Sequence, residues 1–376
     1  MKFKILFVLA NYYPYIGGAE TLFFRLTEGL ARKGHSVRVI TTHLPGSPYF
    51  EIINGIEVER VWVPRLARQY LFSFFGFTSV IRRAYSYDII HTSSNYGALL
   101  AFLVGKINRR RVVFTCNEVL GQRWLIVEGS PIKAWLFRNI ENIIITLPYD
   151  KYVAISQATL KDLVKKGINS AKATVIYCGV DEIFSAQKGR SSGKIRALCG
   201  ISHDDFLYGY FGRPGTTKGV EYLVRAAKLI KSKIPESRLA LILANEPRHN
   251  YKQIARYIQE NNLDSAVKVI PPFESQEALV NHLVDMDCVV IPSLTEGFGL
   301  TTVEACALGI PVVATRVGSI PEVISGRHIL VEPFSPEAIA EGVLHAWQGR
   351  CEWTPPKQFE WAKMVDQYES VYRALI

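Results

Sequence analysis

Two short segments of the C-terminal half combine charged side chains with glycines. Residues 212–219 (GRPGTTKG) carry Arg213 and Lys218, and residues 296–304 (EGFGLTTVE) carry Glu296 and Glu304. Two cations beside the backbone N–H groups of a helix start can hold a diphosphate. A carboxylate can accept hydrogen bonds from the vicinal hydroxyls of a ribose. Each segment alone also fits a plainer alternative, a solvated loop or a charged helix surface, so the elements around them matter.

Both segments follow apolar runs and precede helical patterns. Strands are predicted at 206–212 and 288–293, and helices at 220–234 and 300–308. The N-terminal half repeats the scheme with a strand at 4–10, a glycine-bearing loop and a helix. Strands that alternate with helices predict an α/β fold, here two Rossmann-like doubly wound domains. Ligands of such sheets bind beyond the carboxyl ends of the strands, which is where both charged segments lie.

The composition is that of an ordinary globular protein. The chain has 376 residues, 48% of them hydrophobic and 21% charged, which excludes a disordered chain. No apolar run approaches the roughly 20 residues that span a bilayer. The six cysteines lack the close spacing of zinc ligands, and we interpret them as core residues in a reducing compartment. We therefore expect a cytoplasmic protein without a bound metal.

The positive charge is concentrated in the N-terminal half. Residues 1–185 hold 23 Lys and Arg against 13 Asp and Glu, whereas residues 186–376 hold 21 of each. Such segregation suggests two domains that face different partners. A polar stretch at 185–194 (SAQKGRSSGK) is the predicted linker. The predicted bounds are 1–184 for the first domain, 185–355 for the second and 356–376 for a C-terminal helix.

A series of motifs along nearly the whole chain resembles the retaining nucleotide-sugar glycosyltransferases of family 4, which have the GT-B fold. Glu296 and Glu304 form an E-x7-E pattern. The other matching motifs are GGAE (17–20), IS (155–156), YCGVD (177–181), FGR (211–213), KG (218–219), PS (292–293), EGFG (296–299), EA (304–305), GIPVVA (309–314) and PE (321–322). The resemblance implies two domains facing across a cleft, with the C-terminal helix crossing back to the N-terminal domain.

The resemblance also implies roles for individual residues. Arg213 and Lys218 resemble the pair that neutralises the donor diphosphate, and Glu304 resembles the ribose-binding carboxylate. Glu296 resembles the residue that meets the donor sugar. The backbone at Gly212, Phe298, Gly299 and Leu300 would line the donor, and Gly17 and Gly18 resemble the N-domain loop that closes near the diphosphate. The donor is then a co-substrate, and no cofactor or metal is expected.

One motif departs from the family pattern. Many relatives carry a histidine and an acidic residue after the strand predicted at 112–115, where this chain has Asn117 and Glu118. Asparagine can form hydrogen bonds but cannot titrate. We retain both residues as possible sugar or acceptor contacts. His91 is a further candidate, with a packing role as its alternative, and the DMD sequence at 285–287 is interpreted as structural.

The acceptor is expected on the basic N-terminal half. Residues 65–77 (RLARQYLFSFFGF) mix cations with aromatics, which is typical of a segment at an anionic membrane surface. A core helix with solvated arginines is the alternative. Nucleic acid is not expected, because no binding motif accompanies the charge.

Three functions remain open from the sequence. The first is a retaining, metal-independent glycosyltransferase acting on a lipid or a lipid-linked saccharide at the inner face of the membrane. The second is a nucleotide-sugar-binding protein without activity, suggested by Asn117. The third is a GT-B relative of another class, such as a sugar-nucleotide epimerase.

Overall fold

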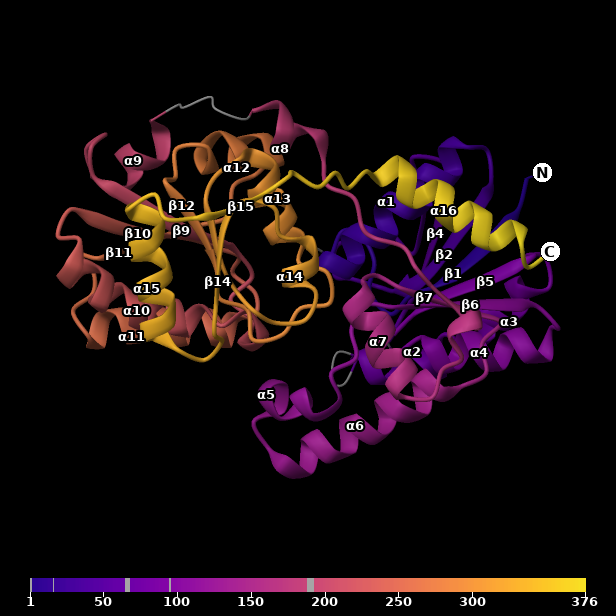
Figure 1. Cartoon of the computed structure of the whole chain (residues 1–376). Coiled ribbons are helices and arrows are strands. Elements are labelled where there is room, and N and C mark those ends of the chain that lie inside the picture. The colour runs from indigo at the N-terminus through magenta and orange to yellow at the C-terminus, as the bar shows by residue number, and fades with distance from the viewer. Residues whose placement is uncertain (1, 16, 65–67, 95, 188–192) are drawn as a thin grey trace. The chain divides into compact units, whose positions relative to one another are not determined.

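The computed structural model covers the chain and describes residues 2–15, 17–64, 68–94, 96–187 and 193–376 (Figure 1). The chain divides into two compact units. Unit 1 comprises the residues up to Gly179 together with Phe359–Ile376, and unit 2 comprises Val180–Gln358. Each unit is built around its own sheet and is described by itself.

Unit 1 contains an eight-stranded sheet in the order β3-β4-β2-β1-β5-β6-β7-β8. All its neighbouring pairs are parallel except β3 with β4. The strands are β1 (Lys4–Val8), β2 (Ser36–Thr42), β3 (Phe50–Ile53), β4 (Ile56–Val61), β5 (Ile89–Ser93), β6 (Arg111–Cys116), β7 (Lys151–Ala154) and β8 (Ala173–Val175). The central strands are buried on both faces, so they appear in the sequence as continuous apolar runs.

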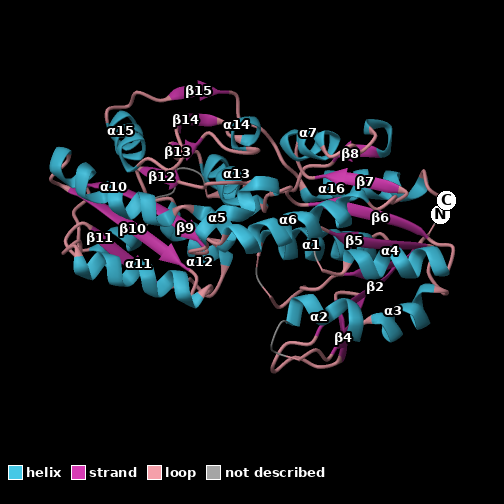
Figure 2. Cartoon of the chain, turned by 90° about the horizontal axis from the view of Figure 1, so that it is seen from below, coloured by secondary structure: helices cyan, strands magenta, loops and turns pink. Residues whose placement is uncertain are grey.

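Helices cover both faces of this sheet. In Figure 1, α1 and α16 lie on one face, and α2, α3 and α4 lie on the other, the side that faces the viewer in Figure 2. The helices of unit 1 are α1 (Gly18–Arg32), α2 (Arg68–Phe75), α3 (Phe77–Ala84), α4 (Ala98–Ile107), α5 (Trp124–Glu128), α6 (Pro131–Thr146), α7 (Gln157–Lys165) and α16 (Trp361–Arg373). The C-terminal helix α16 packs on α1, and its Met364, Val365, Tyr368 and Tyr372 are buried.

Unit 2 contains a seven-stranded sheet in the order β11-β10-β9-β12-β13-β14-β15, parallel except at β15. Its strands are β9 (Phe206–Gly212), β10 (Ser237–Leu243), β11 (Val267–Ile270), β12 (Cys288–Ile291), β13 (Val312–Thr315), β14 (Gly326–Val331) and β15 (Glu352–Thr354). Its helices are α8 (Glu182–Ala186), α9 (Lys194–Cys199), α10 (Val220–Lys233), α11 (Arg248–Glu260), α12 (Gln276–Leu283), α13 (Leu300–Leu308), α14 (Ile320–Val323) and α15 (Pro336–Trp347). Two apolar clusters, one on each face of the sheet, form the core.

The predicted α/β class and the two doubly wound sheets are confirmed. The predicted strand at 206–212 and helix at 300–308 coincide with β9 and α13. The predicted linker at 185–194 is misplaced, because the division between the units falls at Gly179 and Val180. Phe184 and Ile195, on either side of that stretch, are both buried in the core of unit 2. Residues 188–192 lie outside the described part of the chain.

Candidate functional site

The two charged segments lie at the point where the strand order of unit 2 reverses. From β9 the chain proceeds through α10 to β10 on one side, and from β12 it proceeds through α13 to β13 on the other. The loops that follow β9 and β12 therefore diverge at the carboxyl ends of adjacent strands, which leaves a crevice for a ligand in sheets of this kind. Residues 213–219 and 292–299 form these loops.

Backbone contacts hold the two loops together. The N–H of Leu294 donates to the carbonyl oxygen of Thr217 at 2.7 Å. Gly219 has a φ of +62°, and a Cβ at this position would lie 2.0 Å from the carbonyl oxygen of Pro292. Only glycine allows the backbones to approach so closely at this φ. The close approach brings the side chains of the two loops within reach of one another.

Lys218 and Glu296 form an ion pair across these loops. The Lys218 ammonium lies 2.7 Å from Oε2 and 3.0 Å from Oε1 of Glu296. The hydroxyl of Ser293 also donates to Oε2, at 3.1 Å. Both charged residues are partly buried, and Ser293 is fully buried. Two donors, the Lys218 ammonium and the Ser293 hydroxyl, thus hold the carboxylate in place.

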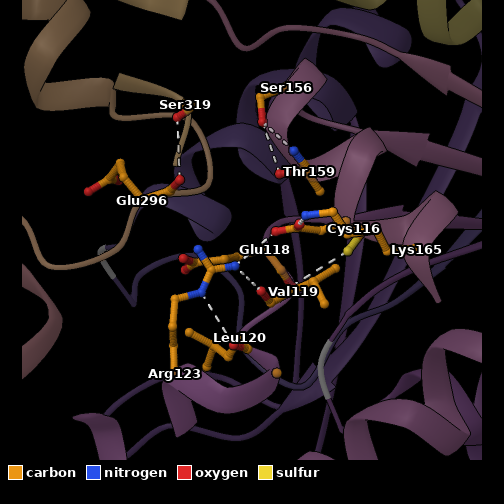
Figure 3. Close-up of polar contacts among 12 residues, drawn as sticks. Cys116, Glu118, Val119, Leu120, Arg123, Ser156, Thr159, Lys165, Glu296 and Ser319 are labelled. Carbon is orange, nitrogen blue, oxygen red and sulfur yellow. Dashed lines mark hydrogen bonds and ion pairs between the residues drawn. The ribbon is translucent and has the colours of Figure 1, made fainter. Parts of the chain in front are cut away.

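The loop after β13 holds the backbone of the same residue, Glu296. The backbone N–H of Ser319 donates to the Glu296 carbonyl oxygen at 3.2 Å, and its hydroxyl lies 3.4 Å from that oxygen, a contact visible in Figure 3. Gly318 has a φ of +49°, and a Cβ there would lie 2.0 Å from the same oxygen. Glu296 is therefore fixed at both its backbone and its side chain.

Arg213 begins the loop after β9 and has a different environment. Its carbonyl oxygen accepts a hydrogen bond of 2.9 Å from the buried Tyr210 hydroxyl. Burial raises the pKa of Tyr210, as does the nearby Glu296 carboxylate, so the phenol remains a donor. Within the described ranges, no carboxylate forms an ion pair with the Arg213 guanidinium. Its charge is available to an anionic ligand.

Glu304 lies in the second turn of α13, which begins after Gly299 at a φ of +85°. Burial, together with the Asp181 carboxylate, raises the pKa of Glu304 to about 8. No hydrogen bond or ion pair to its carboxyl group is found among the residues that the structure describes. On another side of α13, the Thr302 hydroxyl is buried and also lacks a partner there. The Glu304 side chain is partly exposed, so its carboxyl group is accessible to a ligand with hydroxyl groups.

The remaining donor-site candidates of unit 2 are backbone positions. Gly212 ends β9 with a φ of +138°, and Gly299 is the N-cap of α13. The side chain of Phe298 is buried, and Leu300 is the first residue of the helix. The N-terminus of α13, nine residues long, therefore faces the same region as Glu296 and favours negative charge.

The other candidates belong to unit 1. Gly17 is the N-cap of α1 and Gly18 its first residue, so both lie at the carboxyl end of β1, next to the point where that sheet reverses between β1 and β5. Their position within the unit matches that of the unit 2 loops.

Asn117 and Glu118 follow β6. The Asn117 N–H donates to the Ser94 hydroxyl at 3.1 Å, while its side-chain oxygen is buried without a partner among the described residues. Glu141 of α6 accepts from the N–H groups of Leu120 and Gly121 at 2.8 Å each, which fixes the following turn. Figure 3 shows Glu118 in this turn beside Cys116 and Arg123.

His91 is enclosed in the core of unit 1. Its side chain has no exposed surface, and its ring nitrogens contact the Tyr372 hydroxyl at 2.6 Å and the Thr115 hydroxyl at 2.8 Å. Burial lowers the pKa of His91 to about 3, so the ring is neutral at ordinary pH. The enclosed ring favours the packing alternative, and a contact with a sugar stays a prediction. The sequence could not indicate this enclosure, because Tyr372 comes from the C-terminal helix.

The DMD sequence is structural. Both carboxylate oxygens of Asp287 accept from the Arg196 guanidinium at 2.8 Å, and the Leu207 N–H donates to it at 2.7 Å. Asp285 is buried. Across the described ranges, no three His, Cys, Asp or Glu side chains are grouped as metal ligands would be.

Three contributors to the site were given no role from the sequence, although Ser293 and Asp181 stand in the matching motifs PS (292–293) and YCGVD (177–181). Ser293 binds the Glu296 side chain, Ser319 binds its backbone, and Asp181 acts on Glu304. Ser293 had a usable signal, since it stands three residues before Glu296 in the same loop. The other two lie in loops after distant elements, and only the folded sheet brings them close.

Two known protein families together match most of the chain. Residues 16–183 match Glycosyltransferase Family 4, and residues 205–348 match Glycosyl transferases group 1. The chain is 26% identical to a D-inositol 3-phosphate glycosyltransferase of Corynebacterium urealyticum, over 96% of this chain and 91% of that protein.

Solved structures share the fold over the full length. Sucrose-phosphate synthase from Thermosynechococcus elongatus gives a TM-score of 0.77 at 22% identity, covering 99% of both chains. The Anabaena protein HepE, in complex with UDP-glucose, gives 0.74 at 20% identity, covering 99% of this chain and all of that one. At these identities the likeness concerns the GT-B fold.

Proposed function

We propose, on the premise that this chain belongs to the family 4 glycosyltransferases, that unit 2 binds a nucleotide-diphosphate sugar at the loops after β9 and β12. The observation that carries the proposal is the Lys218–Glu296 ion pair at the switch point. Arg213, which has no ion pair within the described ranges, lies in the loop of Lys218, and the partly exposed Glu304 lies on α13, which follows the loop of Glu296. Two cations and two carboxylates in this order suit a diphosphate between a ribose and a sugar.

The diphosphate would be held by Arg213 and Lys218. In the ligand-free chain the Lys218 charge is neutralised by Glu296. A diphosphate brings a larger negative charge, so we expect the ammonium to turn toward it and release the Glu296 carboxylate for the sugar hydroxyls. The N-terminus of α13 adds its dipole to the same charge. Glu304, about one turn further along α13, would bind the ribose hydroxyls.

The same groups explain how transfer could be accelerated. As the bond between the sugar anomeric carbon and the diphosphate oxygen breaks, negative charge grows on the leaving phosphate. Fixed cations stabilise that charge, which typically contributes a factor of about 100 or more per contact. The acceptor hydroxyl oxygen forms the new bond on the same face, and its proton passes to the leaving phosphate oxygen. The anomeric configuration is retained without an enzymic nucleophile or a metal.

Unit 1 would receive the acceptor. Gly17 and Gly18 lie at the corresponding edge of its sheet, where a tight loop lets a ligand approach the backbone. The unpartnered side-chain oxygen of Asn117 can accept a hydrogen bond from a sugar hydroxyl, a contact that does not require an imidazole. Glu118 follows in the same turn. Transfer therefore does not depend on the missing histidine.

The acceptor we propose is a lipid or a lipid-linked saccharide. Unit 1 carries 25 Lys and Arg against 14 Asp and Glu, whereas unit 2 carries 19 against 20. The cationic unit is the one expected to meet the acceptor, and a basic surface attracts an anionic membrane. No helix in the described ranges has the length and apolar character needed to cross a membrane.

A two-stage experiment tests this function. A thermal-shift panel of UDP-, GDP- and ADP-sugars identifies the donor, and the best donor is then incubated with and without a lipid extract, in buffer containing EDTA. We expect sugar transfer only when the extract is present, with retained configuration by NMR. Donor binding without transfer would support the inactive binding protein, and conversion of the donor alone would support an epimerase.

A further inference from the structure

The segment predicted to meet the membrane is only partly available in the structure. Residues 65–67 lie outside the described part, and the side chains of residues 68–70 are not described. Of the aromatics that follow, Phe72 is fully buried, whereas Phe74 is 77% exposed. A core role therefore accounts for part of this segment, and a larger exposed apolar surface lies elsewhere in unit 1.

That surface is one face of α6. The side chains of Ile132, Trp135 and Ile143 are 81%, 60% and 60% exposed, and Leu136 is exposed beside them. Successive residues of a helix are rotated by about 100°, so these four side chains lie along one stripe. We call this stripe the α6 apolar face. An exposed stripe of large apolar groups is unusual on a protein in water and indicates an interaction surface.

Basic side chains border the stripe on both sides. On the same helix, Lys133 lies at one border and Arg138 at the other, since they are rotated by about 100° or more from its centre. The helix carboxylate, Glu141, lies opposite, where it accepts from the Leu120 and Gly121 N–H groups. Neither Lys133 nor Arg138 forms an ion pair with a carboxylate within the described ranges. An apolar stripe bordered by free cations is typical of a helix lying in a membrane interface.

The packing of α6 explains why the stripe remains uncovered. Its opposite side packs on the chain itself, through the buried Ala134 and Ile145 and through Phe137, whose ring stacks on Trp124 of α5 at 5.2 Å. Both views place α6 on the side of the first sheet that carries α2 and α4 (Figures 1 and 2).

A second stripe of exposed apolar side chains, also accompanied by basic residues, lies on α4. Leu99, Leu103 and Ile107 are exposed at intervals of four residues. Lys106 on the same helix and Arg109 after it are exposed cations. Over residues 77–147, which include α3, α4 and α6, nine Lys and Arg face four Asp and Glu. Charge complementarity therefore favours an anionic bilayer over a neutral apolar partner.

We propose that the α6 apolar face, together with the stripe on α4, docks unit 1 onto an anionic phospholipid bilayer. The large apolar side chains enter the headgroup region, and Lys133 and Arg138 extend along the helix to the phosphates. This inference rests on the proposed function in that it names the membrane from which a lipid acceptor would be taken.

Vesicle flotation of the full chain tests the proposal, with phosphatidylcholine vesicles that either contain or lack phosphatidylglycerol. We expect recovery with the anionic vesicles, little with the neutral ones, and a loss in 1 M salt, where the Debye length falls to about 3 Å. Ile132→Ser with Trp135→Ser should lower the partition coefficient about tenfold or more, because each removes a large apolar group from the lipid. Lys133→Ser with Arg138→Ser should also lower it about tenfold or more.

Matched control variants test whether a loss of flotation comes from the α6 apolar face or from the removal of any exposed apolar side chain. Ile52→Ser with Trp353→Ser removes an isoleucine and a tryptophan that are 67% and 65% exposed, on the edge strands β3 and β15, and should float like the wild type. Equal recovery with neutral and anionic vesicles, no recovery, or wild-type flotation of the α6 variants would overturn the proposal. So would a dimer, seen by light scattering, that Trp135→Ser abolishes.

Donor binding is measured separately, without vesicles. If the α6 variants bind the nucleotide sugar like the wild type but no longer float, the docking surface is supported independently of the donor site. If the wild type floats as expected but binds no nucleotide sugar, the proposed function fails and the docking surface remains.

Discussion

Replacing Glu304 with glutamine should stabilise the protein at neutral and alkaline pH while weakening donor binding. Burial and Asp181 raise the pKa of Glu304 from an ordinary value of 4.5 to about 8, so the folded chain holds a proton that the unfolded chain releases. Between pH 4.5 and about pH 8, the unfolded state binds fewer protons at this residue than the folded state does. The free energy of unfolding therefore falls as the pH rises, by up to about 1.4 kcal/mol per unit.

The size of the effect follows from this shift. A shift of the pKa from 4.5 to about 8 corresponds to a loss of about 5 kcal/mol in the free energy of unfolding. Because the Glu304 side chain is partly exposed, we expect a smaller loss of about 2 kcal/mol between pH 5 and pH 8. Glutamine resembles the protonated acid in shape and cannot ionise. The stability advantage of Glu304→Gln should therefore be small at pH 5 and largest at pH 8.

Urea denaturation at pH 5, 6, 7 and 8, followed by tryptophan fluorescence, measures this advantage. Glu341→Gln, which changes an exposed carboxylate on α15, is the control and should show no such trend. A Glu304→Gln advantage that stays constant from pH 5 to pH 8 would refute the reasoning, because it would mean that the carboxyl group is ionised in the folded chain throughout this range.

Three further predictions follow from the same site. Lys218→Ala and Arg213→Ala should each lower turnover about 100-fold, because each removes a cation from the leaving diphosphate; steady-state kinetics would contradict this if either variant kept wild-type activity. Gly318→Ala should destabilise the protein by more than about 2 kcal/mol in urea, since its Cβ would lie 2.0 Å from the Glu296 oxygen, whereas Gly349→Ala, also at positive φ but with open space, should cost only about 1 kcal/mol. Transferase activity should be the same with and without EDTA, and a strict metal requirement would show that cations of the chain are not sufficient to stabilise the leaving group.

The sequence was informative where a pattern depends on neighbouring residues. The apolar run before Arg213 and the helical pattern after Gly299 predicted β9 and α13 with correct ends, because buried parallel strands and glycine-bounded helices are marked locally. These ends place Arg213, Lys218 and Glu296 at one edge of a sheet. The charged segments could therefore be assigned to one crevice before the structure was known.

Properties that depend on distant residues could not be predicted in this way. The pKa of Glu304 depends on Asp181, far away in the sequence, and His91 is enclosed because Tyr372 of the C-terminal helix packs against it. The exposed face of α6 was also missed, since its apolar residues resemble those of a core helix. Only the packing of the opposite side shows which of its residues remain uncovered.

Calorimetric titration with the nucleotide sugar selected by the thermal-shift panel tests the central claim most directly. The wild type should bind one donor molecule, Lys218→Ala should bind it about tenfold or more weakly, and Lys228→Ala, an exposed lysine on α10, should bind like the wild type. If the wild type binds no nucleotide sugar, or if Lys218→Ala binds as tightly as the wild type, the loops after β9 and β12 are not the donor site.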